Sequence, residues 1–468
     1  MKKIMNWVIA ATLVCGTGVF TACSNSEDNP AQEQAKQNRK EFVQHTRATM
    51  KYMAQNLNFT SWEDANTFNT YFNQYVLGNP NFKTSVMWAT LLTGFKNFQV
   101  VEPGSELAEM GFTQYMSLHM SDLKFRFTMT ADNQDFDCEE ADQFEVVING
   151  YNPLTQQIEP GIYKVTLKSS GTSWQKVVPV PNSDGGALVF FLPSEFQFAL
   201  SSKITGDWHE DFSGILHFTL PEGATDDSLG YSADAVINTD IIAADQKSDK
   251  TQLTFSLSSD RVNNTGNALL SWEQNGRKML ELTIKESGEG EGGIRNFDLS
   301  QFTNSSSILE VFAALMDSKR LDEGKLTLLD DLTTTISISD MKKCIEVAHE
   351  AAVARRHNAD QATIDQYTQQ MNALMQCTMT CKGVNQTIPM CLTTQKFGVD
   401  YMSMPSFNFA DESGYVSIVD LLDAESIQYG INIIDHAAEP MQQSVIVVRQ
   451  LVEFALSLFS FMDITPNE

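Results

Sequence analysis

Residues 269–284 read LLSWEQNGRKMLELTI and contain the clearest turn signal in the chain. At their centre, Asn275-Gly276 separates two runs in which apolar and polar residues alternate. A two-residue hairpin turn of this type needs positive φ at both positions, which Asn and Gly tolerate better than other residues. Beyond the turn, the alternate apolar residues from Leu280 to Ile284 fall on one side of a strand, because successive side chains point to opposite faces. The stretch therefore predicts an antiparallel hairpin with one apolar face.

The same period of two recurs through the middle of the chain, where Asp184-Gly185-Gly186 marks another turn. The other alternating runs are Leu123 to Met129, Tyr163 to Leu167, Phe196 to Leu200, Leu216 to Leu220 and Leu253 to Leu257. Short half-buried strands of this kind form an antiparallel meander with one apolar face. We expect another sheet, helices or a ligand to cover that face.

Helical periodicity dominates the residues before this sheet. From about Arg39 to Leu57, apolar side chains recur at three- and four-residue spacing. A second helix is expected from Ser61, whose hydroxyl can cap the first turn, to about Tyr75. A third, apolar helix is expected over residues 84–95.

The composition changes after the sheet. Residues 287–293, SGEGEGG, predict a flexible linker or loop. Helices are expected beyond it over residues 305–320, from Asp340 to His357, and from Asp360 to about Gly383. The last two form an αα-hairpin, because each begins at an aspartate that can cap it and a short turn joins them.

Two short strands and an apolar segment end the chain. The strands are expected over residues 390–400 and 406–410. Residues 445–462 are largely apolar but include Arg449 and Glu453, so we expect a core helix there rather than a membrane span.

Together these patterns predict an α+β fold with N-terminal helices, a central antiparallel sheet, and a C-terminal helical region with a few strands. The predicted division is a signal peptide at 1–22, a lipidated flexible tether at 23–38, a helical region at 39–100, a sheet region at 101–286, a linker or loop at 287–300, and a helix-rich region at 301–468.

The charge of the chain limits its partners. Its 32 Lys and Arg oppose 59 Asp and Glu, which gives a formal net charge of −27. Such a field repels phosphate backbones, so nucleic acid is excluded as a partner, and anionic membrane surfaces are expected to be poor partners. The acids are scattered rather than clustered, which is typical of a solvated surface.

The N-terminus carries the one motif with a specific chemistry. A basic start at residues 1–3 precedes a short apolar run, as in a secretory signal peptide. The sequence Phe20-Thr21-Ala22-Cys23 then resembles the lipobox of bacterial lipoproteins. The resemblance implies cleavage between Ala22 and Cys23 and acylation of Cys23, which would attach the chain to a lipid bilayer without a protein span.

The polar residues after Cys23 bear on where that bilayer is. Residues 24–30, SNSEDNP, resemble the export signal of Bacteroidetes lipoproteins that reach the outer face of the outer membrane. The resemblance implies a surface-exposed lipoprotein of the outer membrane. A periplasmic orientation is the alternative, because any solvated tether is polar.

Five cysteines follow Cys23, and Cys138 is isolated from the other four. Because the envelope is oxidising and the predicted helical hairpin would bring the first of the four near the second, we expect disulfides among them: Cys344, Cys377, Cys381 and Cys391. The alternative is a metal site with His349. The Cys-x3-Cys spacing is not a specific zinc signature, so no metal is predicted.

No pattern identifies a catalytic residue or a cofactor. The seven histidines do not form His-Glu-x-x-His, and no Walker or Gly-x-Ser-x-Gly pattern occurs. The densest polar cluster is residues 208–211, WHED, where a general acid or base would stand beside a sugar-stacking ring. A loop before the next strand is the favoured interpretation. Adjacent acids at 139–140, 226–227 and 330–331 are expected by chance in so acidic a chain, so they give little support to glycoside hydrolysis.

One short motif concerns modification. Asp227-Ser228-Leu229 resembles the acceptor of the Bacteroidetes O-glycosylation system, which implies a glycan on Ser228.

The expected function is non-enzymatic binding of a glycan, an apolar ligand or a protein partner by an anchored envelope lipoprotein. The anchor, the aromatic sheet and the lack of a catalytic pattern favour it. A surface hydrolase acting on polysaccharide or peptide, and an adhesion or surface-assembly component, are the alternatives.

Overall fold

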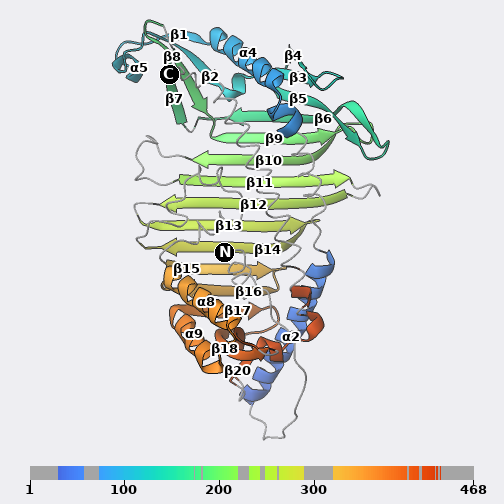
Figure 1. The fold of residues 1–468 in the computed structure, drawn as a ribbon, viewed down its shortest axis with the longest axis vertical. Coiled ribbons are helices and arrows are strands. Elements are labelled where there is room, and N and C mark those ends of the chain that lie inside the picture. Colours follow the sequence, from blue (N-terminus) through green and yellow to red (C-terminus); the bar gives the residue numbers. More distant parts are fainter. Residues whose placement is uncertain are drawn as a thin grey trace. The chain divides into compact units, whose positions relative to one another are not determined.

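The computed structural model describes residues 30–56, 73–172, 174–180, 183–219, 231–242, 248–260, 263–288, 320–397, 400–410, 414–426, 428–430 and 433. These residues form helices and a large mixed sheet, which confirms the α+β fold class (Figure 1). The chain divides into two compact units. Unit 1 comprises Met1–Phe59 and Phe255–Gln442, and unit 2 comprises Thr60–Thr254 and Gln443–Glu468.

Unit 2 contains most of the predicted sheet region. Its described helical segments are η1 (Asn73–Leu77), α4 (Pro80–Lys96), α5 (Glu106–Glu109) and η2 (Met120–Asp122). Its strands are β1 (Phe98–Val100), β2 (Gln114–His119), β3 (Phe125–Met129), β4 (Phe136–Glu140), β5 (Phe144–Asn152), β6 (Gln157–Ser170), β7 (Trp174–Pro179), β8 (Gly186–Leu192), β9 (Glu195–Ser202), β10 (His209–Thr219) and β11 (Tyr231–Ile242). Strand β12 (Ser248–Asp260) has residues in both units.

The strands of unit 2 are arranged in two groups. One is a four-stranded sheet of order β1-β2-β8-β7, and the other has the order β11-β10-β9-β6-β5-β3-β4. The expected antiparallel meander is confirmed where β9, β10 and β11 follow one another. Two parallel pairs were not expected, β2 with β8 and β3 with β5. A parallel pair needs a crossover connection, so its pairing leaves no local turn signal in the sequence.

Period-two alternation explains the core of this unit. Phe125, Phe127 and Met129 of β3 are buried, whereas Arg126 and Thr128 between them are only partly buried. The pleat places alternate residues on opposite faces, and burial of the apolar set removes it from water.

Unit 1 contains the remaining strands and the longer helices. The described helices are α2 (Pro30–Asn56), α8 (Met341–Arg356), α9 (Gln361–Leu374) and the short η4 (Ile418–Asp420). The strands are β13 (Thr265–Gln274), β14 (Arg277–Ser287), β15 (Arg320–Leu328), β16 (Leu332–Ile338), β17 (Met375–Cys381), β18 (Ile388–Phe397), β19 (Asp400–Asn408) and β20 (Tyr415–Ser417), and they lie in this order, each beside the next.

The hairpin predicted from residues 269–284 is confirmed. Asn275 has φ 50° and Gly276 has φ 75°, and they join β13 to β14. Trp272 pairs with Leu280 across the two strands, and its side chain is almost completely buried.

Helix α2 begins earlier than expected. It starts at Pro30, so part of the predicted tether at 23–38 is helical, and proline is well tolerated at a first helical position. Phe42 is fully buried, with ring centroids 5.0 Å from Phe407 and 5.3 Å from Phe409. The packing of Phe42 against these two rings holds the helix in its position.

The αα-hairpin is confirmed in part. Asp340 and Asp360 cap α8 and α9 by accepting backbone hydrogen bonds of 2.8 and 2.9 Å. However, α9 ends at Leu374 rather than near Gly383, because Met375–Cys381 pairs along its length with β16 as strand β17. The expected helices over residues 305–319 and 445–462, and most of 61–75, lie outside the described residues.

The expected linker at 287–300 does not end the sheet. Strand β14 before it pairs with β15 after it, with Leu280 opposite Leu328, and residues 289–319 lie outside the described part. The region after the linker therefore contributes β15 to β20 as well as the helical hairpin.

Candidate binding surface

From Val86 to Phe95, helix α4 has no charged side chain on any side, and its only polar residues there are Thr90 and Thr93. Asn79 caps it by accepting hydrogen bonds from the amides of Asn81 and Phe82, and Pro80 occupies its first turn. An amphipathic helix on a protein surface has one polar side, whereas a helix that is apolar all round is normally covered all round. The outward side of α4 therefore needs an explanation.

The inward side of α4 is well packed. The ring centroid of Phe82 lies 5.5 Å from that of Phe127 and 4.9 Å from that of Phe136. Near the other end of the helix, Gly94 lies directly over the side chains of Met116 and Leu118 in β2. These contacts hold the helix in a fixed rotation, so the opposite side is held towards solvent.

Five large apolar side chains are exposed on and beside this helix, and we call them the α4–β1 face. Trp88, Leu92 and Phe95 are 59%, 53% and 66% exposed, and their spacing of four and three residues places them on one side of α4. Phe98 and Val100 of β1 are 51% and 74% exposed.

Strand β1 continues the apolar side of the helix. Phe98 pairs with Met116, the residue that Gly94 covers, so the strand lies next to the end of α4. Phe98 and Val100 share one side of β1, because they are two residues apart. At roughly half the area of five large side chains, the exposed apolar surface is on the order of 500 Å², near the upper end of what monomeric proteins expose.

The face lies in an unusual part of an acidic chain. Between residues 65 and 101 the sequence has no Asp or Glu, and its charged residues there are Lys83 and Lys96. Lys96 forms an exposed ion pair of 2.7 Å with Glu140. Acids from other segments therefore lie beside this helix: Glu140 balances the charge of Lys96, and Asp122 accepts a hydrogen bond from Asn97.

The polar cluster predicted at residues 208–211 is held by structural contacts. His209 Nε2 donates a hydrogen bond of 2.6 Å to the carbonyl oxygen of Asp240, and it lies 4.0 Å from a carboxylate oxygen of Asp211 and of Asp240. The Trp208 ring has Lys164 Nζ at 4.6 Å and Lys203 Nζ at 4.4 Å from its centroid. The proton on His209 Nε2 is donated to a backbone carbonyl, so the hydrogen bond has a structural role. The ammonium groups of Lys164 and Lys203 lie near the Trp208 ring, where a sugar would have to stack.

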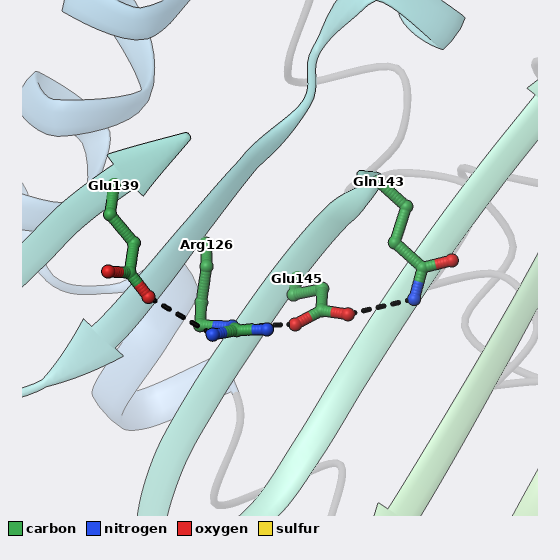
Figure 2. A network of polar contacts seen from close by, with 4 residues as sticks. All are labelled: Arg126, Glu139, Gln143 and Glu145. Atoms are coloured by element: carbon green, nitrogen blue, oxygen red, sulfur yellow. Dashed lines mark hydrogen bonds and ion pairs between the residues drawn. The ribbon is translucent and has the colours of Figure 1, made fainter. Parts of the chain in front are cut away.

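A second polar network crosses three strands of unit 2 (Figure 2). Arg126 of β3 donates to Glu145 of β5 at 2.7 Å and to Glu139 of β4 at 3.1 Å, and Gln143 donates to Glu145 at 2.8 Å. Burial raises the pKa of Glu145, but the hydrogen bonds from Arg126 and Gln143 outweigh it and hold the pKa below its ordinary value. Every carboxylate of this network is paired, so it serves to join strands.

The adjacent acids do not form a catalytic pair in the described residues. Glu139 binds Arg126 and Glu140 binds Lys96, on opposite faces of β4 as neighbouring strand residues must be. Asp331 is paired with Lys382 at 3.3 Å. Glycoside hydrolysis needs two carboxyl groups on either side of one sugar bond. The carboxyl groups of Glu139 and Glu140 point away from each other and do not meet this requirement.

The four cysteines expected to form disulfides are free thiols in the structure, as is Cys138. Cys377 and Cys381 lie on strand β17 rather than on a helix, so four residues separate them by roughly 13 Å, which exceeds disulfide reach. Met390 is the partner of Cys377 on β18, so Cys391 beside it points to the opposite face. Burial raises the pKa of Cys344 to about 11 and that of Cys377 to about 12.

Several predicted sites lie outside the described residues. These are the cleavage and acylation site at Ala22 and Cys23 and the glycosylation acceptor Ser228. Within the described ranges, no group of three His, Cys, Asp or Glu side chains could hold a metal ion, and no helix is long and apolar enough to cross a bilayer.

Comparison with known proteins gives no relative. No family model, curated protein or solved structure matches the chain.

The sequence interpretation missed the α4–β1 face. It identified the helix over residues 84–95 but not the side that stays in solvent. A signal was present in the sequence, because residues 86–95 contain no charged residue on any side of the helix and acids are absent from residues 65–101.

Proposed function

We propose that this chain is an envelope lipoprotein, acylated at Cys23, that acts by non-enzymatic binding through its α4–β1 face. The single observation that supports the proposal most strongly is the exposure of Trp88, Leu92 and Phe95 on a helix whose other side is firmly packed. Leaving such side chains in water costs free energy that a bound partner recovers.

The favoured binding mode follows from the same geometry. Each of the five side chains is more than half exposed, so they project from the molecule instead of lining a pocket. A small apolar ligand needs a concave site that surrounds most of its surface. The face therefore suits an extended apolar surface, and the proposal favours a macromolecular partner over a small ligand.

The glycan-binding and hydrolase alternatives have weaker support. At the predicted cluster, the ring of Trp208 is already shared by two lysines and His209 donates to a backbone carbonyl. Of the adjacent acids, Glu139 and Glu140 each pair with a different cation, on opposite faces of β4.

Site-specific photocrosslinking in cells tests the proposal. The full-length lipoprotein would carry a photoreactive phenylalanine analogue at Leu92, with a matched control at Gln369, an exposed position of α9. We expect a crosslinked species from position 92 that the control does not give. Equal crosslinking at the two positions would refute binding through this face.

A further inference from the structure

We propose that unit 1 binds the soft monovalent cation Cu(I) through the sulfur atoms of Cys377 and Met390, with a third sulfur from the same face of strand β17. The inference does not depend on the α4–β1 face, whose residues belong to unit 2. Three features of unit 1 support it: a strand face made of sulfur side chains, the distance between two of their sulfur atoms, and the partial exposure of the ligands.

One face of strand β17 consists entirely of sulfur-containing side chains. The strand pairs with β16 without a register shift, so its alternate residues share a face. That face presents Met375, Cys377, Met379 and Cys381. Ordinary core packing accounts for Met379 and Cys381, which are buried. Met375 and Cys377 are only partly buried, so an ion from solution can reach this part of the face.

Strand β18 places another sulfur atom beside Cys377. Met390 is the cross-strand partner of Cys377, and the Cys377 thiol donates a hydrogen bond of 3.7 Å to the Met390 Sδ. Two metal–sulfur bonds of roughly 2.3 Å that meet at an angle of roughly 110–120° hold their sulfur atoms roughly 3.8–4.0 Å apart. The two sulfur atoms therefore need to move by only a few tenths of an ångström to bind one ion.

The third ligand comes from a methionine next to Cys377 on the same face. Met375 and Met379 are each two residues away along the strand, which is roughly 6.6 Å. A methionine side chain has three rotatable bonds and can cross such a distance. We expect Met375 to be the ligand, because its partly exposed side chain can turn towards Cys377 without leaving a cavity in the core.

The ligand types determine which ion the site favours. Thiolate and thioether sulfur favour soft cations such as Cu(I), whereas Zn²⁺ is held by Cys, His, Asp and Glu. Of the three proposed ligands, only Cys377 is of a type that Zn²⁺ uses. Burial raises the pKa of the Cys377 thiol to about 12, so binding breaks the S–H bond, forms an S–Cu bond and releases the proton to solvent. The affinity should therefore rise with pH.

Competition with the chelator bicinchoninate tests the site. The whole chain from residue 23 onward, with Cys23→Ser, would be kept reduced under anaerobic conditions and titrated with Cu(I). We expect the affinity of the tightest site to fall at least ~10-fold in Met390→Leu and further in Cys377→Ser. Leucine has nearly the volume of methionine, so Met390→Leu removes the thioether with little change in packing and remains decisive if Cys377→Ser folds poorly.

Two matched controls lie on the opposite face of the same strands or their neighbour. Cys391 of β18 is also partly buried, and Met404 of β19 pairs with Thr393 on that opposite face. Cys391→Ser and Met404→Leu should bind Cu(I) as the parent does. Circular dichroism of every variant would verify that the fold is retained.

The ultraviolet sulfur-to-copper absorption gives a second measurement. It should be lost at one equivalent of Cu(I) in Cys377→Ser and kept, with weaker binding, in Met390→Leu and Met375→Leu. An affinity that Met390→Leu leaves unchanged would overturn the inference. So would binding that disappears only when the exposed Cys138 is replaced, or a site that takes Zn²⁺ in preference to Cu(I).

Discussion

The network of Arg126, Glu139, Gln143 and Glu145 leads to a prediction about stability. Its geometry determines both the direction of the change in the free energy of unfolding and how that change depends on pH. In Arg126→Met, the Glu145 carboxylate, whose side chain is only 10% exposed, loses its charge-assisted hydrogen bond of 2.7 Å. A hydrogen bond to a charged group contributes about 1.5–3 kcal/mol, and the half-exposed arginine reduces that through solvent screening. We expect a loss of about 1–2 kcal/mol in the free energy of unfolding near pH 7.

The loss should depend on pH in a defined direction. Because the pKa of Glu145 is lowered in the folded protein, the pair stabilises the fold above the ordinary glutamate pKa of about 4.3, and that stabilisation fades as the pH falls through the lower folded value. In Arg126→Met the buried carboxyl takes up a proton at higher pH. The difference between variant and parent is therefore largest at neutral pH and shrinks under acid conditions.

Urea denaturation followed by fluorescence and circular dichroism provides the measurement. The matched control is Lys96→Met, which removes an ion pair to Glu140 in which both side chains are largely exposed, and it should change the midpoint little. A deficit for Arg126→Met that stays constant from about pH 7 to about pH 4 would refute the reasoning. So would a Glu145→Gln background in which Arg126→Met costs as much as before.

Three further predictions concern the core, the hairpin turn and the thiols. Phe82→Ala should lower the free energy of unfolding by about 3–5 kcal/mol, seen as a lower urea midpoint, because a buried ring packed on Phe127 leaves a cavity; an unchanged midpoint would show that α4 does not pack as described. Gly276→Ala should cost about 1 kcal/mol through backbone strain alone, since φ is +75° and no atom lies within 4 Å of the added Cβ; a neutral result would argue against this turn. Iodoacetamide at about pH 8, without reductant, should modify the exposed Cys138 first and leave Cys344 unmodified until denaturant is added, because burial keeps its thiol protonated; thiols that stay blocked in denaturant until reduced would restore the disulfide hypothesis.

Local signals in the sequence were sufficient for many individual elements. The Asn275-Gly276 turn, the aspartate caps of α8 and α9, and the alternation in β3 were each predicted from a few neighbouring residues. Each of these features depends on interactions between residues that are close together in the sequence. The residues that cause the structure are therefore the same residues that predict it.

Local signals of this kind could not predict which distant segments pair as neighbouring strands. Residues 375–381 were expected to continue a helix, yet backbone hydrogen bonds to β16 make them a strand. The parallel pairing of β3 with β5 and the continuation from β14 to β15 likewise depend on partners that only the folded chain brings together. Tertiary contacts override local propensity because they satisfy every backbone group of a strand at once.

The sequence by itself determined the apolar character of residues 84–95, the absence of acids from residues 65–101, and the lipobox resemblance at Cys23. Only the tertiary structure decided which side of α4 faces solvent. Phe82 and Gly94 fix the helix against the core, and this rotation leaves Trp88, Leu92 and Phe95 outside. The physical reason is that periodicity identifies an inward side only when the other side is polar, and between Val86 and Phe95 neither side of the helix carries a charged residue.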